Sequence, residues 1–390
     1  MRVMHIGKFF APFAGGIENF MLDLVRACAS RDVEQAALVH ESPGDEGRNA
    51  GGAEHGLVAL RRVPVLGQFV YAPVAPRFRV ELEAMLADFR PDLLHVHAPN
   101  ASAFWLLASR RARRLPWVVH WHSDVVGPGL DTRLKLLYPG YKPFEHALLR
   151  RADVVIATSP PYLDSSRALA RWRHKCRLIP LGLDPARVES DSADPRDDDW
   201  HGGARLRLLA LGRLTRYKGM EVLVRAAQDV PGVSVNIVGD GAERRRLERL
   251  IPDSSAARIR VLGPVDDSVR NRLLAGCDVL CLPSLNRAEA FGMALLEAMA
   301  SGKPTIATRV PGSGMDWVVE EGRTGWLVDP GDVDALGRLI QSMISQRSRL
   351  ADYGVEARRR FEKRFRIDAV ADEIVEVYRD AIVSRIESAM

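Results

Sequence analysis

Residues 206–228 read LRLLALGRLTRYKGMEVLVRAAQ, and this stretch decides the fold. Its first six residues are almost all apolar, as in a strand that is buried on both faces of a parallel sheet. Gly212 follows the strand, a charged turn comes next, and apolar spacing from Met220 to Gln228 predicts a helix. A strand, a turn and a helix in this order form the unit from which parallel α/β sheets are built.

The same unit recurs on both sides of this stretch, with helical patterns between most of the apolar strands. In the first half the predicted strands are residues 2–7, 36–40, 93–97, 117–120, 154–157 and 177–180. In the second half they are residues 206–211, 233–238, 259–262, 279–282, 305–307 and 326–328. The pattern predicts two α/β domains, each with a parallel sheet covered on both faces.

A stretch rich in Pro, Ser, Gly and Asp separates the two halves and ends in Asp197, Asp198 and Asp199. Such a stretch is typical of a linker, and we interpret the aspartates as a solvated spacer rather than a metal site. The predicted organisation is an N-terminal domain 1–184, a linker 185–203, a second domain 204–365 and an amphipathic helix 366–390. That helix could dock on either half. Two Rossmann-like sheets facing across a cleft would place ligands at the carboxyl ends of the strands.

Composition excludes several classes of protein. The chain has 390 residues, 47% hydrophobic and 27% charged, which is ordinary for a globular protein and unlike collagen or a disordered chain. Neither an apolar run of about 20 residues nor a secretory signal is evident. The cysteines lack the spacing of a zinc or redox motif, which predicts reduced core cysteines of a cytosolic protein: Cys28, Cys176, Cys277 and Cys281.

Charge is distributed unevenly along the chain. Residues 1–183 hold 24 Lys+Arg against 17 Asp+Glu, a net +7, and the remainder holds 31 against 33, a net −2. A basic first half suits an anionic partner such as membrane lipid, a phosphate-bearing substrate or nucleic acid, although it could equally be a solvated arginine-rich face. Because no zinc finger, helix-turn-helix or aromatic-interleaved strand is present, we do not expect nucleic acid to be the partner.

The richest candidate segment is residues 283–304, PSLNRAEAFGMALLEAMASGKP. Glu289 precedes a predicted helix and Glu297 lies within it, so a ligand rich in hydroxyl groups fits beside the helix N-terminus. The two carboxylates are separated by two turns and about 80°, and would therefore address different parts of an elongated ligand. Gly292, in the first turn, would let that ligand approach the backbone.

Further candidates follow other strands of the second half. Arg213 and Lys218 are five residues apart at a strand end, where a guanidinium fork and an ammonium group can clamp a diphosphate. Gly239 is as consistent with a tight turn as with a ligand contact. Asp267 could accept hydrogen bonds from guanine or could cap the helix that follows it.

In the first half, Gly15 and Gly16 stand at the first strand-to-helix junction, where backbone N–H groups can hold an anion. The pattern differs from the dinucleotide-binding fingerprint. His122 ends a strand with Ser123 and Asp124 beside it, which favours a functional role. A zinc site at His95 and His97 would need a third ligand that the sequence does not identify, so no metal site is predicted.

Together these motifs resemble the retaining glycosyltransferases of the GT-B fold, the group called family 4. The resemblance covers nearly the whole chain, from Gly-Gly-Ile-Glu at 15–18 through Gly-Arg…Lys-Gly at 212–219 to the Glu-x7-Glu motif at 289–297. Residues 120–125, 151–160, 179–184, 312–314 and 325–331 are similar to bacterial mannosyl- and rhamnosyltransferases of surface-polysaccharide assembly.

The resemblance implies a role for each matching residue. Arg213 and Lys218 would bind the donor diphosphate, Glu297 the ribose hydroxyls and Glu289 the hydroxyls of the donor sugar. Phe291, Gly292 and Met293 would contact the sugar through their backbone, and Gly15 and Gly16 would contact the phosphates. His122 would lie near the anomeric carbon, and Asp267 would contact guanine. Asn-Arg-Ala stands before Glu289 where the family carries a glycine pair, which leaves the identity of the sugar open.

The implied activity is a metal-independent, retaining hexosyl transfer without a cofactor, from GDP-mannose or a GDP-deoxyhexose. The implied acceptor is a lipid-linked glycan of O-antigen, capsule or exopolysaccharide synthesis, met at the inner face of the cytoplasmic membrane by a peripheral enzyme. The alternatives are a UDP-hexose donor, an inactive nucleotide-sugar-binding subunit and a sugar-nucleotide epimerase.

Overall fold

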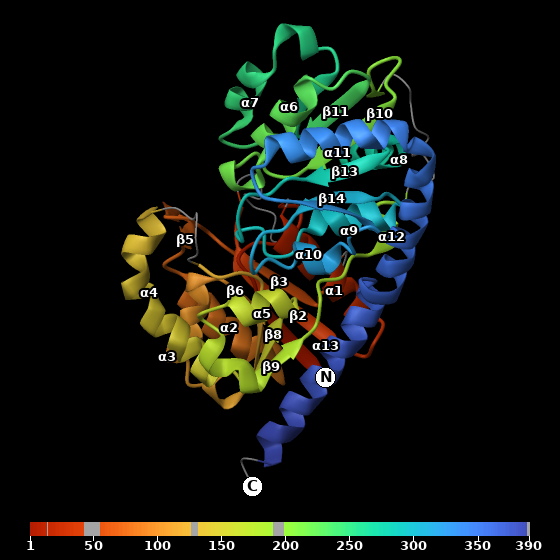
Figure 1. Ribbon diagram of the computed structural model, residues 1–390. Coiled ribbons are helices and arrows are strands. Elements are labelled where there is room, and N and C mark those ends of the chain that lie inside the picture. Colours follow the sequence, from red (N-terminus) through yellow and green to blue (C-terminus); the bar gives the residue numbers. More distant parts are fainter. Residues whose placement is uncertain (14, 43–54, 126–131, 190–198, 388–390) are drawn as a thin grey trace. The chain divides into compact units, whose positions relative to one another are not determined.

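The computed structural model describes residues 1–13, 15–42, 55–125, 132–189 and 199–387 (Figure 1). The chain forms two compact units, which are described separately. The first comprises Met1–Gly182 together with Ile367–Met390, and the second comprises Leu183–Arg366. Among the described helices, none combines the length and the apolar character that crossing a membrane requires.

The first unit is built on a seven-stranded sheet whose neighbouring strands are all parallel. In sheet order its strands are β3 (Ala59–Val63), β2 (Glu34–His40), β1 (Arg2–Ile6), β6 (Leu93–Ala98), β7 (Trp117–Trp121), β8 (Val154–Ala157) and β9 (Cys176–Leu178). The six predicted strands are confirmed. The edge strand β3 and the antiparallel hairpin of β4 (Gly67–Phe69) and β5 (Ala72–Val74) were not predicted.

Helices cover both faces of this sheet: α1 (Gly16–Ala29), α2 (Phe78–Phe89), α3 (Trp105–Ala108), α4 (Thr132–Arg151), α5 (Pro160–Ser165) and α13 (Ile367–Glu387). The alternation of side chains along β2 shows which helix covers which face of the sheet. Gln35 donates a hydrogen bond to the Val25 carbonyl in α1, whereas His40 stacks on Phe78 of α2 at 4.9 Å between ring centroids. The helices α1 and α2 therefore lie on opposite faces.

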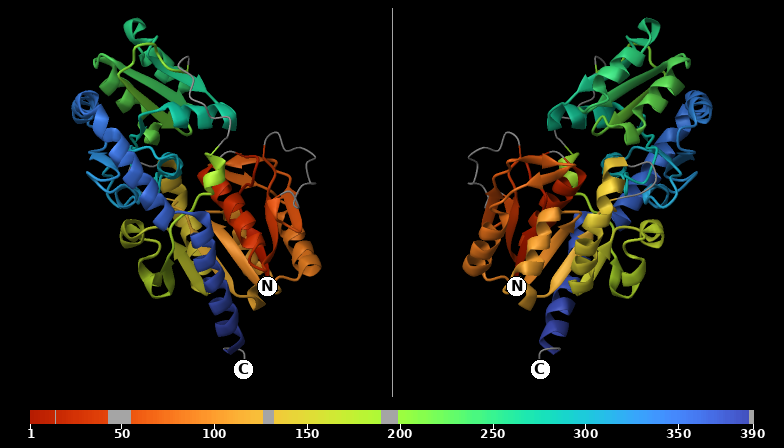
Figure 2. Two further views of the ribbon diagram at one scale, coloured as in Figure 1. Left: turned by 90° about the vertical axis from the view of Figure 1, so that its right-hand side faces the viewer. Right: turned by 90° about the vertical axis from the view of Figure 1, so that its left-hand side faces the viewer.

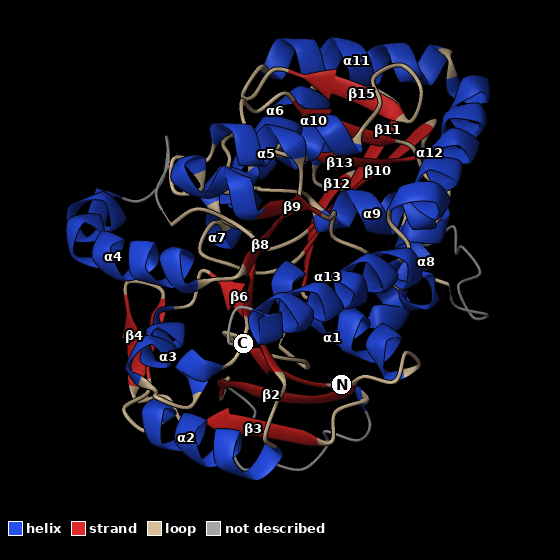
Figure 3. Cartoon of the chain, turned by 90° about the horizontal axis from the view of Figure 1, so that it is seen from below, coloured by secondary structure: helices blue, strands red, loops and turns tan. Residues whose placement is uncertain are grey.

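The C-terminal helix α13 belongs to the first unit and lies beside α1 (Figures 2 and 3). Two polar contacts fix it there in addition to its apolar stripe. Arg31, just past the end of α1, pairs with Asp372 at 2.6 Å, and Tyr378 contacts the His95 imidazole at 2.5 Å. Of the two docking positions that the sequence left open, the structure selects the first half.

The second unit holds a six-stranded sheet, also parallel throughout. Its strands in sheet order are β12 (Ile259–Gly263), β11 (Val233–Val238), β10 (Leu206–Leu211), β13 (Val279–Leu282), β14 (Thr305–Thr308) and β15 (Gly325–Val328). Its helices are α6 (Met220–Gln228), α7 (Arg244–Leu250), α8 (Asp267–Gly276), α9 (Met293–Ala300), α10 (Met315–Val318), α11 (Val333–Ser345) and α12 (Leu350–Arg364). The α/β class with two parallel sheets is as predicted.

Part of the expected linker is integral to the second unit. The Arg187 carbonyl accepts hydrogen bonds from Arg270 at 3.0 Å and from Asn271 at 2.8 Å. Asp199 pairs with Arg272 at 2.8 Å and is largely buried, so its interpretation as a solvated spacer was wrong. Asp197 and Asp198 lie outside the described residues. The spacing of charges in sequence could not reveal an arginine 73 residues away.

Candidate functional site

An ion pair joins two neighbouring strand ends of the second unit. Lys218 lies in a 3-10 turn after β10, Glu289 lies in the loop after β13, and the Lys218 ammonium contacts the Glu289 carboxylate. Both side chains are almost fully buried, with 12% and 11% exposed. Burial by itself would lower the pKa of Lys218, but the Glu289 charge outweighs it and raises that pKa above its ordinary value. Lys218 is therefore cationic at neutral pH.

Hydroxyl groups from two strand ends hold Glu289 in position. Ser284 donates to the Glu289 Oε2 at 3.4 Å, and Ser313 donates to the Glu289 backbone carbonyl at 2.6 Å. Thr308 in turn donates to the Ser284 carbonyl at 2.5 Å. The sequence analysis did not select these three residues. Their positions at or just after the ends of β13 and β14 are the signal that could have found them.

The loops after β10 and β11 are packed so closely that only glycine fits between them. Gly239 has a φ of 137°, and a Cβ there would stand 2.0 Å from the Gly212 carbonyl oxygen. The tight-turn alternative for Gly239 is thereby satisfied, and its contact with a ligand stays a prediction. The Lys218 side chain lies against Gly212, 3.3 Å from where a Cβ would be. Arg213 is exposed and forms no ion pair within the described part of the chain.

The segment that enters α9 presents its backbone and one carboxylate. Gly292 is the N-cap with a left-handed φ of 89°, a conformation that side chains rarely adopt. The Phe291 side chain is buried against Trp317 and Phe365, which leaves its backbone for a ligand contact. Glu297 is only 9% exposed, and its carboxylate makes no hydrogen bond to any described residue. A carboxylate on a largely buried residue, with no hydrogen bond to a described residue, is suited to a ligand that brings hydroxyl donors.

Asp267 does not cap α8. The cap is Asp266, whose carboxylate accepts from the Val269 N–H at 2.8 Å. Asp267 is exposed in the first turn and pairs with Arg270 at 2.7 Å. The capping alternative for Asp267 was therefore wrong by one residue.

In the first unit, Gly15 is the N-cap of α1 and Gly16 is its first residue. The carboxylate of Glu18 lies beside Gly15, 2.1 Å from where a Cβ would be, so a larger residue there would require the Glu18 side chain to move. The helix begins there with its positive dipole end, as expected of a position that attracts an anion.

His122 directly follows β7 and is buried, with its ring stacked on that of His120 at 4.3 Å between centroids. Burial lowers the pKa of His122 to about 3, so its imidazole is neutral at pH 7. Asp124, expected to support it, instead accepts hydrogen bonds from Trp121 at 2.9 Å and from Ser166 at 2.7 Å.

Other strands supply the metal-site ligands that the sequence did not identify. Two groups of three histidines have ring nitrogens within 4.8 Å of one another: His5, His95 and His97, and His97, His120 and His122. The stated reason for rejecting a zinc site was thus wrong. However, His97 belongs to both groups, and both of its ring nitrogens already form hydrogen bonds, at 3.2 Å to His5 and at 3.1 Å to His122. A metal would have to break one of these bonds.

Two family models match the chain in succession. Residues 15–182 match the model described as "Glycosyl transferase 4-like domain", and residues 201–364 match "Glycosyl transferases group 1". The chain is a group 1 glycosyltransferase. The GT-B fold, the retaining hexosyl transfer and the family 4 membership implied by the sequence are all confirmed. The family generally uses nucleotide-sugar donors without a metal.

Similar proteins span nearly the whole of this glycosyltransferase. The O-antigen chain mannosyltransferase C of Escherichia coli is 28% identical over 387 residues, which cover 99% of this chain and 100% of that protein. The D-rhamnosyltransferase WbpZ of Pseudomonas aeruginosa is 28% identical over 386 residues, 94% of this chain and 92% of that one. The structure of Anabaena HepE in complex with UDP and glucose has a TM-score of 0.76 at 20% identity, covering 97% and 100% of the two chains.

Proposed function

We propose that this glycosyltransferase moves mannose or a deoxyhexose from a GDP-linked donor to a lipid-linked glycan of a surface polysaccharide. The mannosyl- and rhamnosyltransferases to which it is similar support the sugar class. The observation that carries the proposal is the buried pair of Lys218 and Glu289, a cation and a hydroxyl acceptor side by side at the strand ends. A diphosphate sugar needs both groups at adjacent points.

The difficult step is departure of the nucleoside diphosphate while positive charge develops on the sugar. Lys218 is fixed and desolvated, and Arg213 is free to close on the phosphate oxygens, so both can stabilise the leaving group. The phosphates provide Lys218 with a second anion, and Glu289 then accepts hydrogen bonds from sugar hydroxyls. The backbones of Phe291, Gly292 and Met293, which follow Glu289 in the chain, would contact the sugar as well. No metal is required for this stabilisation.

Two carboxylates are suited to the nucleoside. Glu297, which is only 9% exposed, would accept both ribose hydroxyls. Asp267 is exposed and relieved of the capping role, so it is available to the N1 and N2 donors of guanine. In the first unit, Gly15 and Gly16 offer N–H groups to phosphate, and neutral His122 would orient the sugar rather than attack it. A UDP-hexose is the second candidate, because the HepE structure contains UDP.

A thermal-shift panel with GDP, UDP, ADP and dTDP, each with EDTA, tests the donor. At 100 times its dissociation constant, the preferred nucleotide should stabilise the protein by about 2.7 kcal/mol. We expect GDP to be preferred and Glu297→Ala to weaken every nucleotide, whereas Asp267→Ala should weaken GDP alone. A preference for UDP would replace the donor, and no shift with any nucleotide would contradict the proposal. Radiolabelled GDP-mannose hydrolysis without acceptor then distinguishes an enzyme from an inactive subunit.

A surface of the first unit supports the membrane part of the proposal. On α4 the side chains of Leu136, Leu137 and Phe144 are exposed, by 81%, 41% and 53%, beside exposed Lys135 and Lys142. The β4–β5 hairpin lies nearby (Figures 1 and 3). It exposes further apolar side chains: Leu66, Phe69, Tyr71 and Val74. Apolar and basic side chains exposed together are typical of a helix that lies in an anionic membrane interface.

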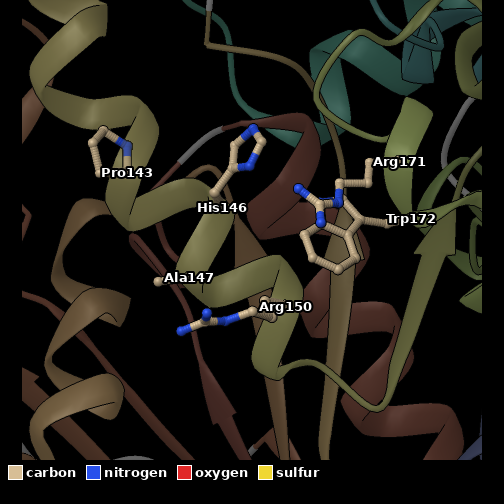
Figure 4. A pocket seen from close by; sticks show the side chains of 6 residues that line it. All are labelled: Pro143, His146, Ala147, Arg150, Arg171 and Trp172. Atoms are coloured by element: carbon tan, nitrogen blue, oxygen red, sulfur yellow. The ribbon is translucent and has the colours of Figure 1, made fainter.

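A cavity of about 240 Å³ adjoins the other end of α4, and Figure 4 shows its lining: Pro143, His146, Ala147, Arg150, Arg171 and Trp172. Arg150 and Arg171 could receive a lipid phosphate there. The basic residues of the first half differ in their contacts. Lys175 donates to the carbonyls of Arg150 and Ala152 at 3.1 and 2.7 Å and is structural. The membrane prediction rests on this residue and on six arginines that are exposed: Arg110, Arg111, Arg113, Arg114, Arg171 and Arg173.

Vesicle flotation tests this surface. We expect the protein to bind phosphatidylglycerol vesicles at low salt, to bind phosphatidylcholine vesicles weakly, and to lose binding when Leu136→Glu and Leu137→Glu are combined. Val355→Glu, at an apolar residue of α12 that is 65% exposed, is the control and should change nothing. Equal binding to both vesicle types, or none, would contradict a peripheral location at an anionic membrane.

A further inference from the structure

One row of side chains crosses the first sheet from strand to strand. Gln35 on β2 contacts the His5 Nε2 on β1 at 3.1 Å, and the His5 Nδ1 contacts the His97 Nε2 on β6 at 3.2 Å. The His97 Nδ1 then contacts the His122 Nε2, after β7, at 3.1 Å. All four residues are buried. The row thus uses four successive strands in sheet order.

The sheet register explains how the row reaches the carboxyl ends of the strands. Gln35 is level with Val3, His5 is level with His95, and His97 is level with His120. Each step therefore moves one strand across and two residues toward the carboxyl end. Because side chains alternate with a period of two, every member stays on the same face, which α1 and α13 cover.

The direction of every hydrogen bond in the row follows from its first member. The Gln35 Nε2 donates to the Val25 carbonyl at 2.7 Å, so its oxygen faces His5 and can only accept. His5 must donate from Nε2, and its neutral ring then accepts at Nδ1 from the His97 Nε2–H. By the same logic His97 accepts at Nδ1 from the His122 Nε2–H. Burial lowers the pKa of His5 to about 4 and that of His97 well below its ordinary value, which keeps these rings neutral.

The row ends at the His122 Nδ1, which has no hydrogen-bond partner among the described residues. We propose that Gln35, His5 and His97 are positioning residues that hold His122 with its proton on Nε2 and a lone pair on Nδ1. This lone pair accepts a hydrogen bond from a sugar hydroxyl of the substrate, an inference that rests on the proposed function. The tautomer at one end of the row is thus set by an amide three strands away.

Nitrogen NMR of the full chain with 15N-labelled histidine tests the row directly. In the wild type, the His122 Nδ1 should resonate as an unprotonated ring nitrogen at pH 7.5. Gln35→Met removes the acceptor and leaves the His5 N–H unsatisfied, so the protons should shift along the row and a population with protonated His122 Nδ1 should appear. Gln35→Glu restores an acceptor and should restore the wild-type tautomer. His120→Phe keeps the stacking on His122, lies outside the row, and is the matched control.

The same variants should differ in kcat/KM for sugar transfer. Gln35→Met should lower kcat/KM by about tenfold, as expected for a mispaired hydrogen bond, with Gln35→Glu and His120→Phe much closer to wild type. A protonated His122 Nδ1 in the wild type, or Gln35→Met leaving the tautomer unchanged, would overturn the proposal. So would added Zn²⁺ shifting the resonances of His97 at one equivalent per chain. If no nucleotide sugar is transferred at all, the proposed function fails while the NMR result still decides the tautomer.

Discussion

The two parallel sheets differ in how they bury polar groups. In the second unit, Lys218 and Glu289 lie in loops beyond the strands and carry opposite charges. In the first unit, His5 and His97 lie on the strands themselves and are neutral. A loop can bring a counter-ion to a buried charge, whereas a strand interior offers only neighbouring strands at fixed register. The second sheet therefore pairs Lys218 with Glu289 by charge, whereas the first joins His5 to His97 by a neutral hydrogen bond.

The largest expected effect comes from breaking the ionic side of this comparison. Lys218→Ala leaves the Glu289 carboxylate buried without its partner, and should lower the free energy of unfolding by about 3–5 kcal/mol. Transfer should fall by about 100-fold or more, because the leaving group loses a fixed cation. The double variant Lys218→Met, Glu289→Gln should recover most of the stability in urea unfolding but none of the transfer. If Lys218→Ala retained full activity while folded, the donor-site assignment would be wrong.

The neutral histidines of the first sheet should make the protein less stable as the pH falls. The folded pKa of His5 is about 4 and that of His122 about 3, against 6.5 in an unfolded chain. Below pH 6.5 the unfolded state binds protons that the folded state does not, so each group removes up to about 1.4 kcal/mol of stability per pH unit. The urea midpoint should fall steeply from pH 7 to pH 5.

Lys218 does not cause this acid dependence. Its pKa is raised in the folded state, so the stability that it contributes is lost only at alkaline pH, as the pH rises through the folded pKa. His5→Gln should therefore flatten the acid dependence, and His174→Gln, at an exposed position, should leave it unchanged. A midpoint that is constant between pH 7 and pH 5 would show that the row is not neutral in the folded state.

A smaller effect should separate two adjacent histidines. His97→Phe removes the hydrogen-bond partner of both His5 and His122, and should cost about 2 kcal/mol or more. His120 is equally buried, but neither of its ring nitrogens has a partner among the described residues. His120→Phe should therefore leave stability unchanged or increase it. Differential unfolding in urea measures both, and equal losses would contradict the row.

The smallest effect should come from the neighbouring aspartates before α8. Asp266→Ala removes an N-cap and should cost about 1 kcal/mol. Asp267→Ala should change stability by less than about 0.5 kcal/mol, since its exposed pair with Arg270 contributes little. GDP binding should depend on the other aspartate: Asp267→Ala should weaken it, and Asp266→Ala should not. A shared loss of GDP binding would mean that α8 itself, rather than one carboxylate, positions the base.

Much of the fold was predictable, because apolar strands alternating with amphipathic helices are a local signal. The edge strand β3 was missed because its sequence, ALRRV, lacks a continuous apolar run. The extent of α4 is not evident from the sequence, because Pro139 and Pro143 lie inside it. Both elements depend on tertiary contacts. An edge strand forms because it pairs with one neighbouring strand, and a helix that contains proline needs packing to compensate for its lost hydrogen bonds.

The sequence by itself determined the family, the two parallel sheets and the candidates at the strand ends, because the carboxyl ends of parallel strands share one edge. Only the tertiary structure decided that Lys218 pairs with Glu289 and that Asp266, not Asp267, caps α8. It also decided which histidines meet. His5, His97 and His122 come from three strands, and their bonds depend on a register that local sequence does not encode. Side-chain chemistry is local, but hydrogen-bond geometry depends on distances between strands that lie far apart in the chain.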